Sequence, residues 1–198
     1  MDILRFDSKL NGHTVSFGVR EYLFIHSPSI SISNDVQRFK KDLSNRYGEF
    51  RYGNSKAHIS LNHFLTLTTP ERTIKKELYL SFHQWKSFNV NILNFGMFPN
   101  SRTIFLNTSS HEILKLQNYL RTILRQRVKV PKKFTQPLSK PHITIASDIS
   151  KNIFDECWNY FSNKTYEEQF VANRITALCR NLSLEETKFR KVFEIEFN

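Results

Sequence analysis

Two short segments of the chain carry a histidine and a hydroxyl side chain at the same spacing. The segment SKAHISL starts at residue 55, and the segment SKPHITI starts at residue 139. Successive side chains of a β-strand point to opposite faces, so His58 projects together with Ser60, and His142 projects together with Thr144. The isoleucine between them points the other way, toward a packed layer. Each segment is therefore expected to present one imidazole and one hydroxyl group on a common face.

Two such pairs, facing each other, suit the cleavage of a phosphodiester. One neutral imidazole can accept a proton from an attacking water or ribose hydroxyl, while the other, protonated, donates a proton to the departing oxygen. Histidine fits both roles because its unperturbed pKa of about 6.5 lies near neutrality. The hydroxyl groups can donate hydrogen bonds to the non-bridging phosphate oxygens as charge develops there. No cluster of carboxylates accompanies the histidines, so we expect that no metal ion or other cofactor is needed.

The elements that must position these residues follow from hydrophobic periodicity and from capping residues. Strands are expected at 20–27, 56–67, 88–98, 102–107, 141–147, 169–181 and 189–197. Helices are expected from a cap at Ser33 or Asn34 to Gly48, over 70–85 after a cap at Thr69, over 111–126, and from a cap at Asp148 or Ser150 through Phe161. Both histidine segments therefore fall on predicted strands.

The order of these elements indicates an internal duplication. Each half follows the order strand, helix, histidine-bearing strand, helix, strand, and the two histidines lie roughly 80 residues apart. We therefore predict an α+β fold with two pseudo-symmetric βαβαβ lobes, whose antiparallel-rich sheets flank a central groove. Residues 1–19 form an N-terminal extension, and 20–198 form one bilobal domain. Its halves are 20–98 and 99–198, and strands can exchange between them.

The paired H-Φ-(S/T)-Φ tetrads resemble those of the 2H phosphoesterase superfamily, especially its bacterial 2′-5′ RNA ligase-like branch. The likeness runs from about Tyr22 to the end of the chain, and residues 88–107 (FNVNILNFGMFPNSRTIFLN) resemble that family's strand, Gly-x-Phe turn and strand. The resemblance implies a bilobal fold and metal-free chemistry on 2′,3′-cyclic phosphates or 2′-5′ phosphodiesters. The tetrad positions imply two catalytic histidines, His58 and His142, and two phosphate-binding hydroxyls, Ser60 and Thr144.

One position departs from the family pattern. Members often have an arginine shortly after the second tetrad, where this chain has Ala146 and Ser147. Without that guanidinium a two-pronged phosphate clamp is lost, so either the substrate differs or another cation compensates. Lys56 and Lys140 fall on the histidine face by parity and are candidates for this role, although a lysine at a strand end is often only solvated.

Further substrate contacts are less closely defined by the sequence. Phe95, Phe98 and Tyr52 are candidates to stack on a base, although a chain with 18 phenylalanines buries most of them in its core. The basic loop before the second tetrad, which includes Lys132 and Lys133, could steer a polyanion or be merely solvated. His63 falls on the face opposite His58 if the strand is unbroken, so we expect it to lie outside the site.

Charge and cysteine usage bound the setting. The formal net charge of +11 favours an anionic partner, with nucleic acid or nucleotides the leading candidates. Two cysteines outside any C-x-x-C pair give neither a disulfide framework nor zinc-ligand spacing. With no signal peptide and no long apolar run, we expect a soluble cytoplasmic protein with no membrane contact and no obligatory protein partner.

The sequence thus predicts a metal-independent phosphodiesterase that acts on RNA ends or on cyclic or linear nucleotides. Two alternatives stay open. The same two histidines could cleave a cyclic nucleotide or oligonucleotide signal, or the fold could serve as a non-catalytic RNA- or nucleotide-binding module. The direction of the reaction, hydrolysis or ligation, and the division of acid and base roles between the histidines are not defined by the sequence.

Overall fold

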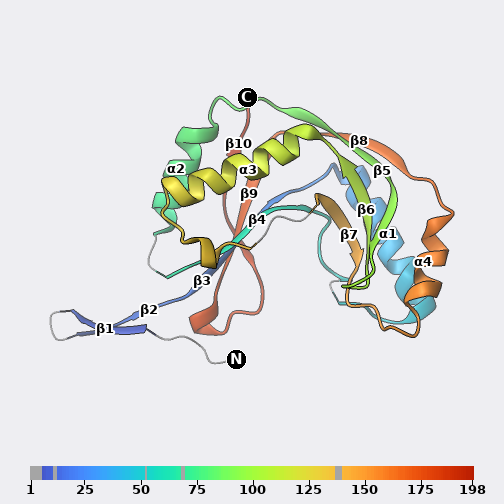
Figure 1. Cartoon of the computed structure of the whole chain (residues 1–198), viewed down its shortest axis with the longest axis horizontal. Helices are drawn as coiled ribbons and strands as arrows, with labels where there is room; N and C mark the ends of the chain where they lie inside the picture. The colour runs from blue at the N-terminus through green and yellow to red at the C-terminus, as the bar shows by residue number, and fades with distance from the viewer. Residues whose placement is uncertain (1–5, 11–12, 52, 68–69, 137–139) are drawn as a thin grey trace.

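The computed structural model describes residues 6–10, 13–51, 53–67, 70–136 and 140–198. They form an α+β fold, as predicted, around one eight-stranded sheet in which all neighbouring strands run antiparallel (Figure 1). The strand order is β10-β9-β3-β4-β7-β6-β5-β8. The strands of this sheet are β3 (Arg20–His26), β4 (Ile59–Thr66), β5 (Phe88–Phe98), β6 (Thr103–Ser109), β7 (His142–Ala146), β8 (Glu167–Ala172), β9 (Arg174–Asn181) and β10 (Arg190–Glu196). Two further strands, β1 (Phe6–Leu10) and β2 (His13–Phe17), pair with each other as a separate two-stranded sheet.

Helices cover each half of the sheet. They are α1 (Ile30–Tyr47), α2 (Glu71–Phe82), α3 (His111–Gln126) and α4 (Phe154–Ser162), with short 3-10 turns η1 (Lys132–Phe134) and η2 (Leu182–Leu184). α2 packs on β10 and α3 packs on β4, at the left of Figure 1, whereas α1 packs on β7 and α4 on β5, at the right. The two helix pairs therefore belong to two halves of the sheet, which meet where β4 pairs with β7.

The halves of the sheet do not coincide with the halves of the sequence. β5 belongs to the first half of the chain, yet it pairs with β6 and β8 from the second half. Conversely, β9 comes from the second half and pairs with β3. Strands are thus exchanged between the two sequence halves, and the proposed division at residue 98 separates β5 from both of its partners. The assignment of 20–198 as one domain with an extension at 1–19 stays a prediction.

The prediction of a single strand over 169–181 is wrong. Asn173 separates β8 from β9, and the two pieces lie in different halves of the sheet, β8 on β5 and β9 between β3 and β10. The backbone N–H of Phe197 donates to the carbonyl of Asn173 at 2.8 Å, which fixes the crossing point. The buried apolar residues fall at Phe170 and Ala172 before the crossing and at Ile175 and Ala177 after it. The alternation therefore shifts by one residue at the polar pair Asn173 and Arg174, a signal of the change of partner that the prediction of one strand missed.

Two predicted helix starts are also wrong, whereas one predicted end is confirmed. α1 is capped by the Ser29 hydroxyl and begins four or five residues before the region expected from Ser33 or Asn34. α4 begins at Phe154, later than a cap at Asp148 or Ser150 predicts. Asp148 adopts a left-handed backbone, φ 54°, and the backbone N–H of Ile149 donates to the carbonyl of Arg102 at 3.2 Å, so this stretch is not helical. Gly48 ends α1 at φ 90°, a conformation that glycine adopts without steric cost.

Packing fixes the two tetrad strands from behind. The isoleucines of the tetrads are fully buried, and each lies under the helices of its half of the sheet.

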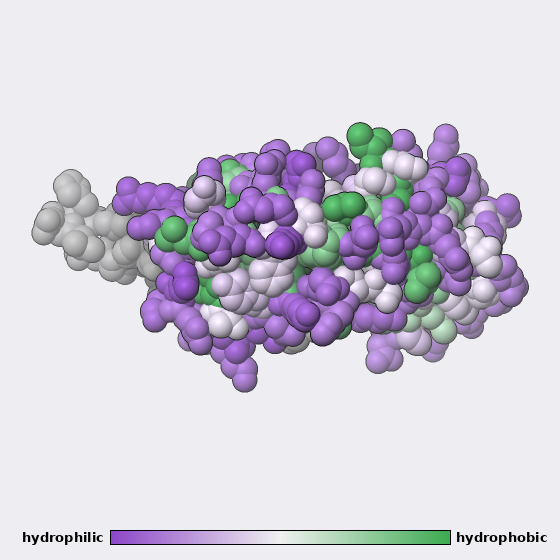
Figure 2. Space-filling view, turned by 90° about the horizontal axis from the view of Figure 1, so that it is seen from above, coloured by the Kyte–Doolittle hydropathy of each residue, from purple (hydrophilic) through white to green (hydrophobic). Residues whose placement is uncertain are grey.

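Seen from above, the molecule presents mostly hydrophilic side chains with scattered apolar ones (Figure 2). Within the part of the chain that the structure describes, no helix is long and apolar enough to cross a membrane.

Candidate active site

The two tetrads lie side by side at the centre of the sheet. β4 and β7 pair antiparallel with Ile59 directly opposite Ile143. Opposed residues in an antiparallel pair share a face, so extension of this register by one residue in each direction sets each histidine against the hydroxyl of the other tetrad. The opposed residues are His58 with Thr144, and Ser60 with His142. These four half-buried side chains share one face, which we call the tetrad face, and the register gives them an approximate two-fold relation.

Both imidazoles are held by the same hydrogen bond. Nδ1 of His58 lies 2.8 Å from the carbonyl oxygen of Lys56, and Nδ1 of His142 lies 2.7 Å from that of Lys140. Because a carbonyl oxygen only accepts, Nδ1 must be the protonated nitrogen in each ring. In the neutral rings Nε2 is then left with its lone pair, as a proton acceptor, and in the charged rings it carries the proton that can be donated.

The environment of both histidines favours their neutral form. Burial lowers the pKa of His58, and the positive charges of Lys40 and His142 lower it further, against the hydrogen bond to the Lys56 carbonyl. Burial also lowers the pKa of His142, with a smaller contribution from Lys140. The effect of one imidazole on the other means that protonation of His142 disfavours protonation of His58. A pair with one neutral and one charged imidazole is the combination that acid–base catalysis requires.

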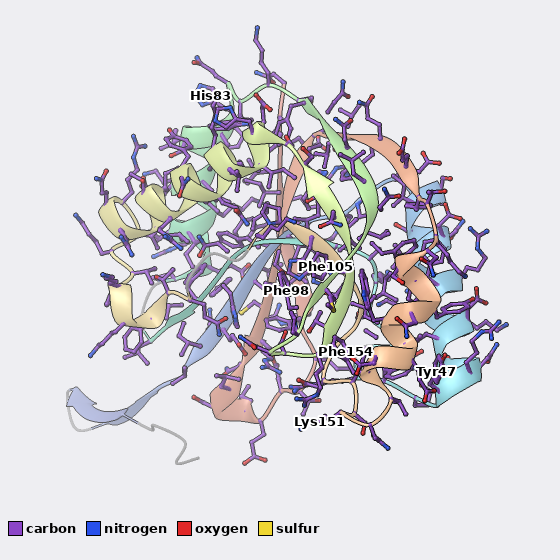
Figure 3. All side chains as sticks on the ribbon, turned by 45° about the vertical axis from the view of Figure 1, so that its right-hand side comes forward. Tyr47, His83, Phe98, Phe105, Lys151 and Phe154 are labelled. Carbon is purple, nitrogen blue, oxygen red and sulfur yellow. The ribbon has the colours of Figure 1, made fainter. Side chains whose placement is uncertain are left out.

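Aromatic side chains surround His142. The ring of Phe98 lies 5.1 Å from the imidazole, edge to face, and that of Phe105 lies at 5.0 Å. The two phenylalanines are 4.3 Å apart, side by side near the centre of Figure 3. Gly96 makes this packing possible, since a Cβ there would lie 2.6 Å from the Phe105 ring and 2.9 Å from Asn107 Oδ1. Of the predicted base-stacking candidates, Phe98 therefore lies at the tetrads. Phe95 is buried in the core against Phe161, so its prediction as a stacking residue is wrong.

The two lysines suggested by parity differ in position. The ammonium group of Lys140 donates to Asn107 Oδ1 at 2.9 Å, and the Asn107 amide donates in turn to the Phe95 carbonyl at 2.8 Å. Asn107 is the register partner of His142, so this chain of contacts holds a positive charge beside that histidine. The side chain of Lys56 is exposed, and the residue acts on His58 through its backbone carbonyl.

A β-bulge in β4 supports Ser60. Leu61 is the extra residue, because the register of β4 with β3 shifts between its two neighbours. Next to the bulge, the buried amide of Gln117 on α3 donates to the carbonyl of Ser60 at 3.1 Å. The bulge also changes the face of every later residue. His63 therefore lies on the tetrad face, contrary to the expectation from an unbroken strand, and its Nε2 contacts the carboxylate of Glu21 at 2.5 Å.

A guanidinium does lie near the position where the family arginine is missing. Arg51 forms an isolated antiparallel bridge with Ser147, and its Nη1 pairs with Asp148 at 2.6 Å. Arg51, which precedes the first tetrad in the sequence, thus places its positive charge beside the residues that follow the second tetrad. Tyr52, predicted as a substrate contact, lies outside the described residues.

Four residues that support the tetrads were missed by reasoning from the sequence. They are Lys40, Phe105, Asn107 and Gln117. The sequence signals that could have found them are weak. Lys40 and Gln117 are polar residues inside the apolar stripe of a helix, and Phe105 and Asn107 alternate along the 102–107 strand. Each signal becomes meaningful only when the partner strand is known.

Metal-binding side chains are not grouped in the described ranges of the chain, where no three His, Cys, Asp or Glu residues lie together as ligands would. Cys157 and Cys179 are both buried and free. Burial raises the pKa of the Cys157 thiol to about 11, which makes it a poor nucleophile at neutral pH.

A family model matches most of the chain. The model of the 2′-5′ RNA ligase superfamily matches residues 28–182, which include both tetrads. No curated protein matches the chain in sequence.

Solved structures share the fold at low sequence identity. E. coli LigT in its apo form superposes with a TM-score of 0.64 at 14% identity, covering 91% of this chain and 99% of LigT. TT0787 of Thermus thermophilus gives a TM-score of 0.61 at 14% identity, covering 89% of this chain and 97% of TT0787. Since the family model spans most of the chain, the protein belongs to the 2′-5′ RNA ligase superfamily, the 2H phosphoesterases.

Proposed function

We propose that this phosphoesterase is a metal-independent phosphodiesterase that cleaves ribose-linked phosphodiesters, either 2′,3′-cyclic phosphates or 2′-5′ linkages of RNA or nucleotides. His58 and His142 act as general base and general acid, and Ser60 and Thr144 bind the phosphate. The observation that carries the proposal is the matched pair of Nδ1 hydrogen bonds, 2.8 and 2.7 Å long, on two strands that pair directly. Because Nδ1 makes the same hydrogen bond in both imidazoles, Nε2 is left for proton transfer in each of them.

The steps follow from this arrangement. One Nε2 accepts a proton from the attacking water or hydroxyl as its oxygen bonds to phosphorus. The bond from phosphorus to the departing ribose oxygen breaks, and the other Nε2–H donates its proton to that oxygen. The hydroxyl groups of Ser60 and Thr144 donate hydrogen bonds to the non-bridging oxygens, whose negative charge increases in the transition state.

Several features favour a nucleotide or RNA substrate. E. coli LigT, which shares the fold, has been solved with 3′-AMP and with NADP+. Phe98, half-buried beside His142, offers a ring on which a base can stack. The exposed Lys132 and Lys133 of η1 lie on the loop whose Thr135 bridges to Phe64 of β4. They add positive charge near the C-terminal end of β4.

A substrate panel in the presence of EDTA tests the proposal. The panel contains 2′,3′-cyclic nucleotides, 2′-5′ and 3′-5′ dinucleotides and cyclic dinucleotides. We expect cleavage of the 2′,3′-cyclic or 2′-5′ members at the same rate with and without EDTA. Cleavage that EDTA abolishes would contradict the metal-free mechanism, preference for cyclic dinucleotides would favour a signal-degrading enzyme, and binding without any cleavage would identify a non-catalytic module.

A further inference from the structure

A lysine is buried in the helix behind the first tetrad. Lys40 of α1 is 5% exposed and lies on the helix face that also buries Val36, Phe39 and Leu43. A lysine is rarely buried, because desolvation of the ammonium group is costly. Burial lowers the pKa of Lys40 to about 8, so the group still carries its proton in most molecules at neutral pH.

The contacts of Lys40 lead directly to the segment that holds His58. Its Nζ donates to the carbonyl of Ser55 at 2.8 Å and to the Ser55 hydroxyl at 2.9 Å. Gln37, one turn earlier on α1, donates to the same carbonyl at 2.9 Å. The next carbonyl along the chain, that of Lys56, accepts the Nδ1–H of His58. Two donors of α1 therefore fix the backbone that orients this imidazole.

Lys40 also makes the two histidines electrostatically different. The charged groups that act on His58 are Lys40, from α1, and His142, from β7; the one that acts on His142 is Lys140. Lys40 is buried, whereas Lys140 is exposed. Solvent and salt screen an exposed charge far more than a buried one. Solvent therefore screens the charge of Lys40 from His58 less than it screens the charge of Lys140 from His142.

We propose that Lys40 is a positioning residue for His58, which holds the imidazole through Ser55 and keeps it neutral, so that His58 is the proton acceptor and His142 the proton donor. The division of roles rests on the two-histidine mechanism proposed above; the effect of Lys40 on His58 does not. The approximate two-fold relation of the tetrads is thus broken by a residue that lies outside both of them.

Nuclear magnetic resonance titration of the histidine Cε1–H signals tests the effect of Lys40 without any substrate. Lys40→Met and Lys40→Gln remove the charge, and Gln keeps an amide donor for Ser55. Both variants avoid the cost of burying an ammonium group, and Gln37 still donates to the Ser55 carbonyl, so we expect folded protein. The titration midpoint of His58 should move to higher pH in both variants, because a positive charge that opposes its protonation is gone. It should stay in place in Lys40→Arg and in the control Lys41→Met, which alters the exposed neighbouring lysine.

An unchanged His58 midpoint in folded Lys40→Met and Lys40→Gln would overturn the proposal, whether or not the protein cleaves any substrate. The pH profile of kcat/KM then tests the roles. Its acid limb reports the base in the free enzyme, so Lys40→Met should shift the acid limb to higher pH and lower the optimum rate on the order of 10-fold as the imidazole loses its support. A shift of the alkaline limb instead would show that His58 is the acid. A purely structural lysine would lower the rate and move neither limb.

Discussion

Gly96→Ala should damage the candidate site through packing alone. A Cβ at position 96 would lie 2.6 Å from Cε2 and 2.9 Å from Cζ of Phe105, whereas carbon atoms in contact are normally about 3.5–4.0 Å apart. The ring must therefore move by about 1 Å. The Phe105 ring is 2% exposed and packed against both Phe98 and His142, so its movement changes its contacts with both of them.

The expected cost follows from this crowding. Overpacking of a buried site costs about 1–3 kcal/mol, and the lower entropy of alanine in the unfolded chain offsets about 0.4–1 kcal/mol of it. We expect the free energy of unfolding, measured by urea denaturation, to fall by about 1–2 kcal/mol. Because the ring lies against His142, the rate of cleavage of the best substrate should fall by roughly 10- to 100-fold.

Gly18→Ala is the matched control. A Cβ at Gly18 would meet its nearest atom, Oδ1 of Asn181, at 3.4 Å, which is ordinary contact. Its free energy of unfolding should stay within about 0.5 kcal/mol of the wild type. A Gly96→Ala protein that is as stable and as active as the wild type would refute the close approach of β5 to Phe105 and Asn107.

Two further predictions concern the support of the tetrads. Gln117→Leu removes the buried amide that donates to the Ser60 carbonyl, so it should lower the free energy of unfolding by about 1–3 kcal/mol. The control Asn118→Leu, on the exposed face of α3, should change this free energy little. Equal stability of the two variants in urea would argue against the contact. Stability should also fall as the pH is lowered below about 6.5, the value for histidine in the unfolded chain. Burial lowers the pKa of His26, His58 and His142 in the folded state, so the unfolded chain binds more protons there. His58→Gln/His142→Gln should flatten this dependence, and an equally steep loss in the variant would show that the two imidazoles are not buried as described.

Local chemistry was readable from the sequence. The two tetrads identify themselves by residue type and spacing, and strand parity alone puts His58 with Ser60 and His142 with Thr144. Their strands were predicted because β-branched and aromatic residues alternate there. The superfamily that the tetrads suggested is confirmed by the family model, whereas the roles of the tetrad residues stay a prediction.

Long-range pairing was not readable. The match of Ile59 with Ile143 joins strands far apart in the chain, and no local pattern encodes such a register. The bulge at Leu61 inverts the face of His63, because parity holds only in an unbroken strand. Lys40 and Gln117 act from helices that pack on strands of the other sequence half, a pairing that only the folded chain decides.

Cleavage rates of histidine variants test the central claim most directly. The rate of cleavage in EDTA would be measured for the wild type, His58→Ala, His142→Ala and the double variant. The control is His83→Ala, which alters an exposed histidine remote from Phe98 and Phe105 (Figure 3). If the two imidazoles work as one unit, each single variant should lose about 10²-fold or more, the double variant should lose much less than the product of the two, and the control should lose nothing. Full activity in either His58→Ala or His142→Ala would contradict the two-histidine mechanism.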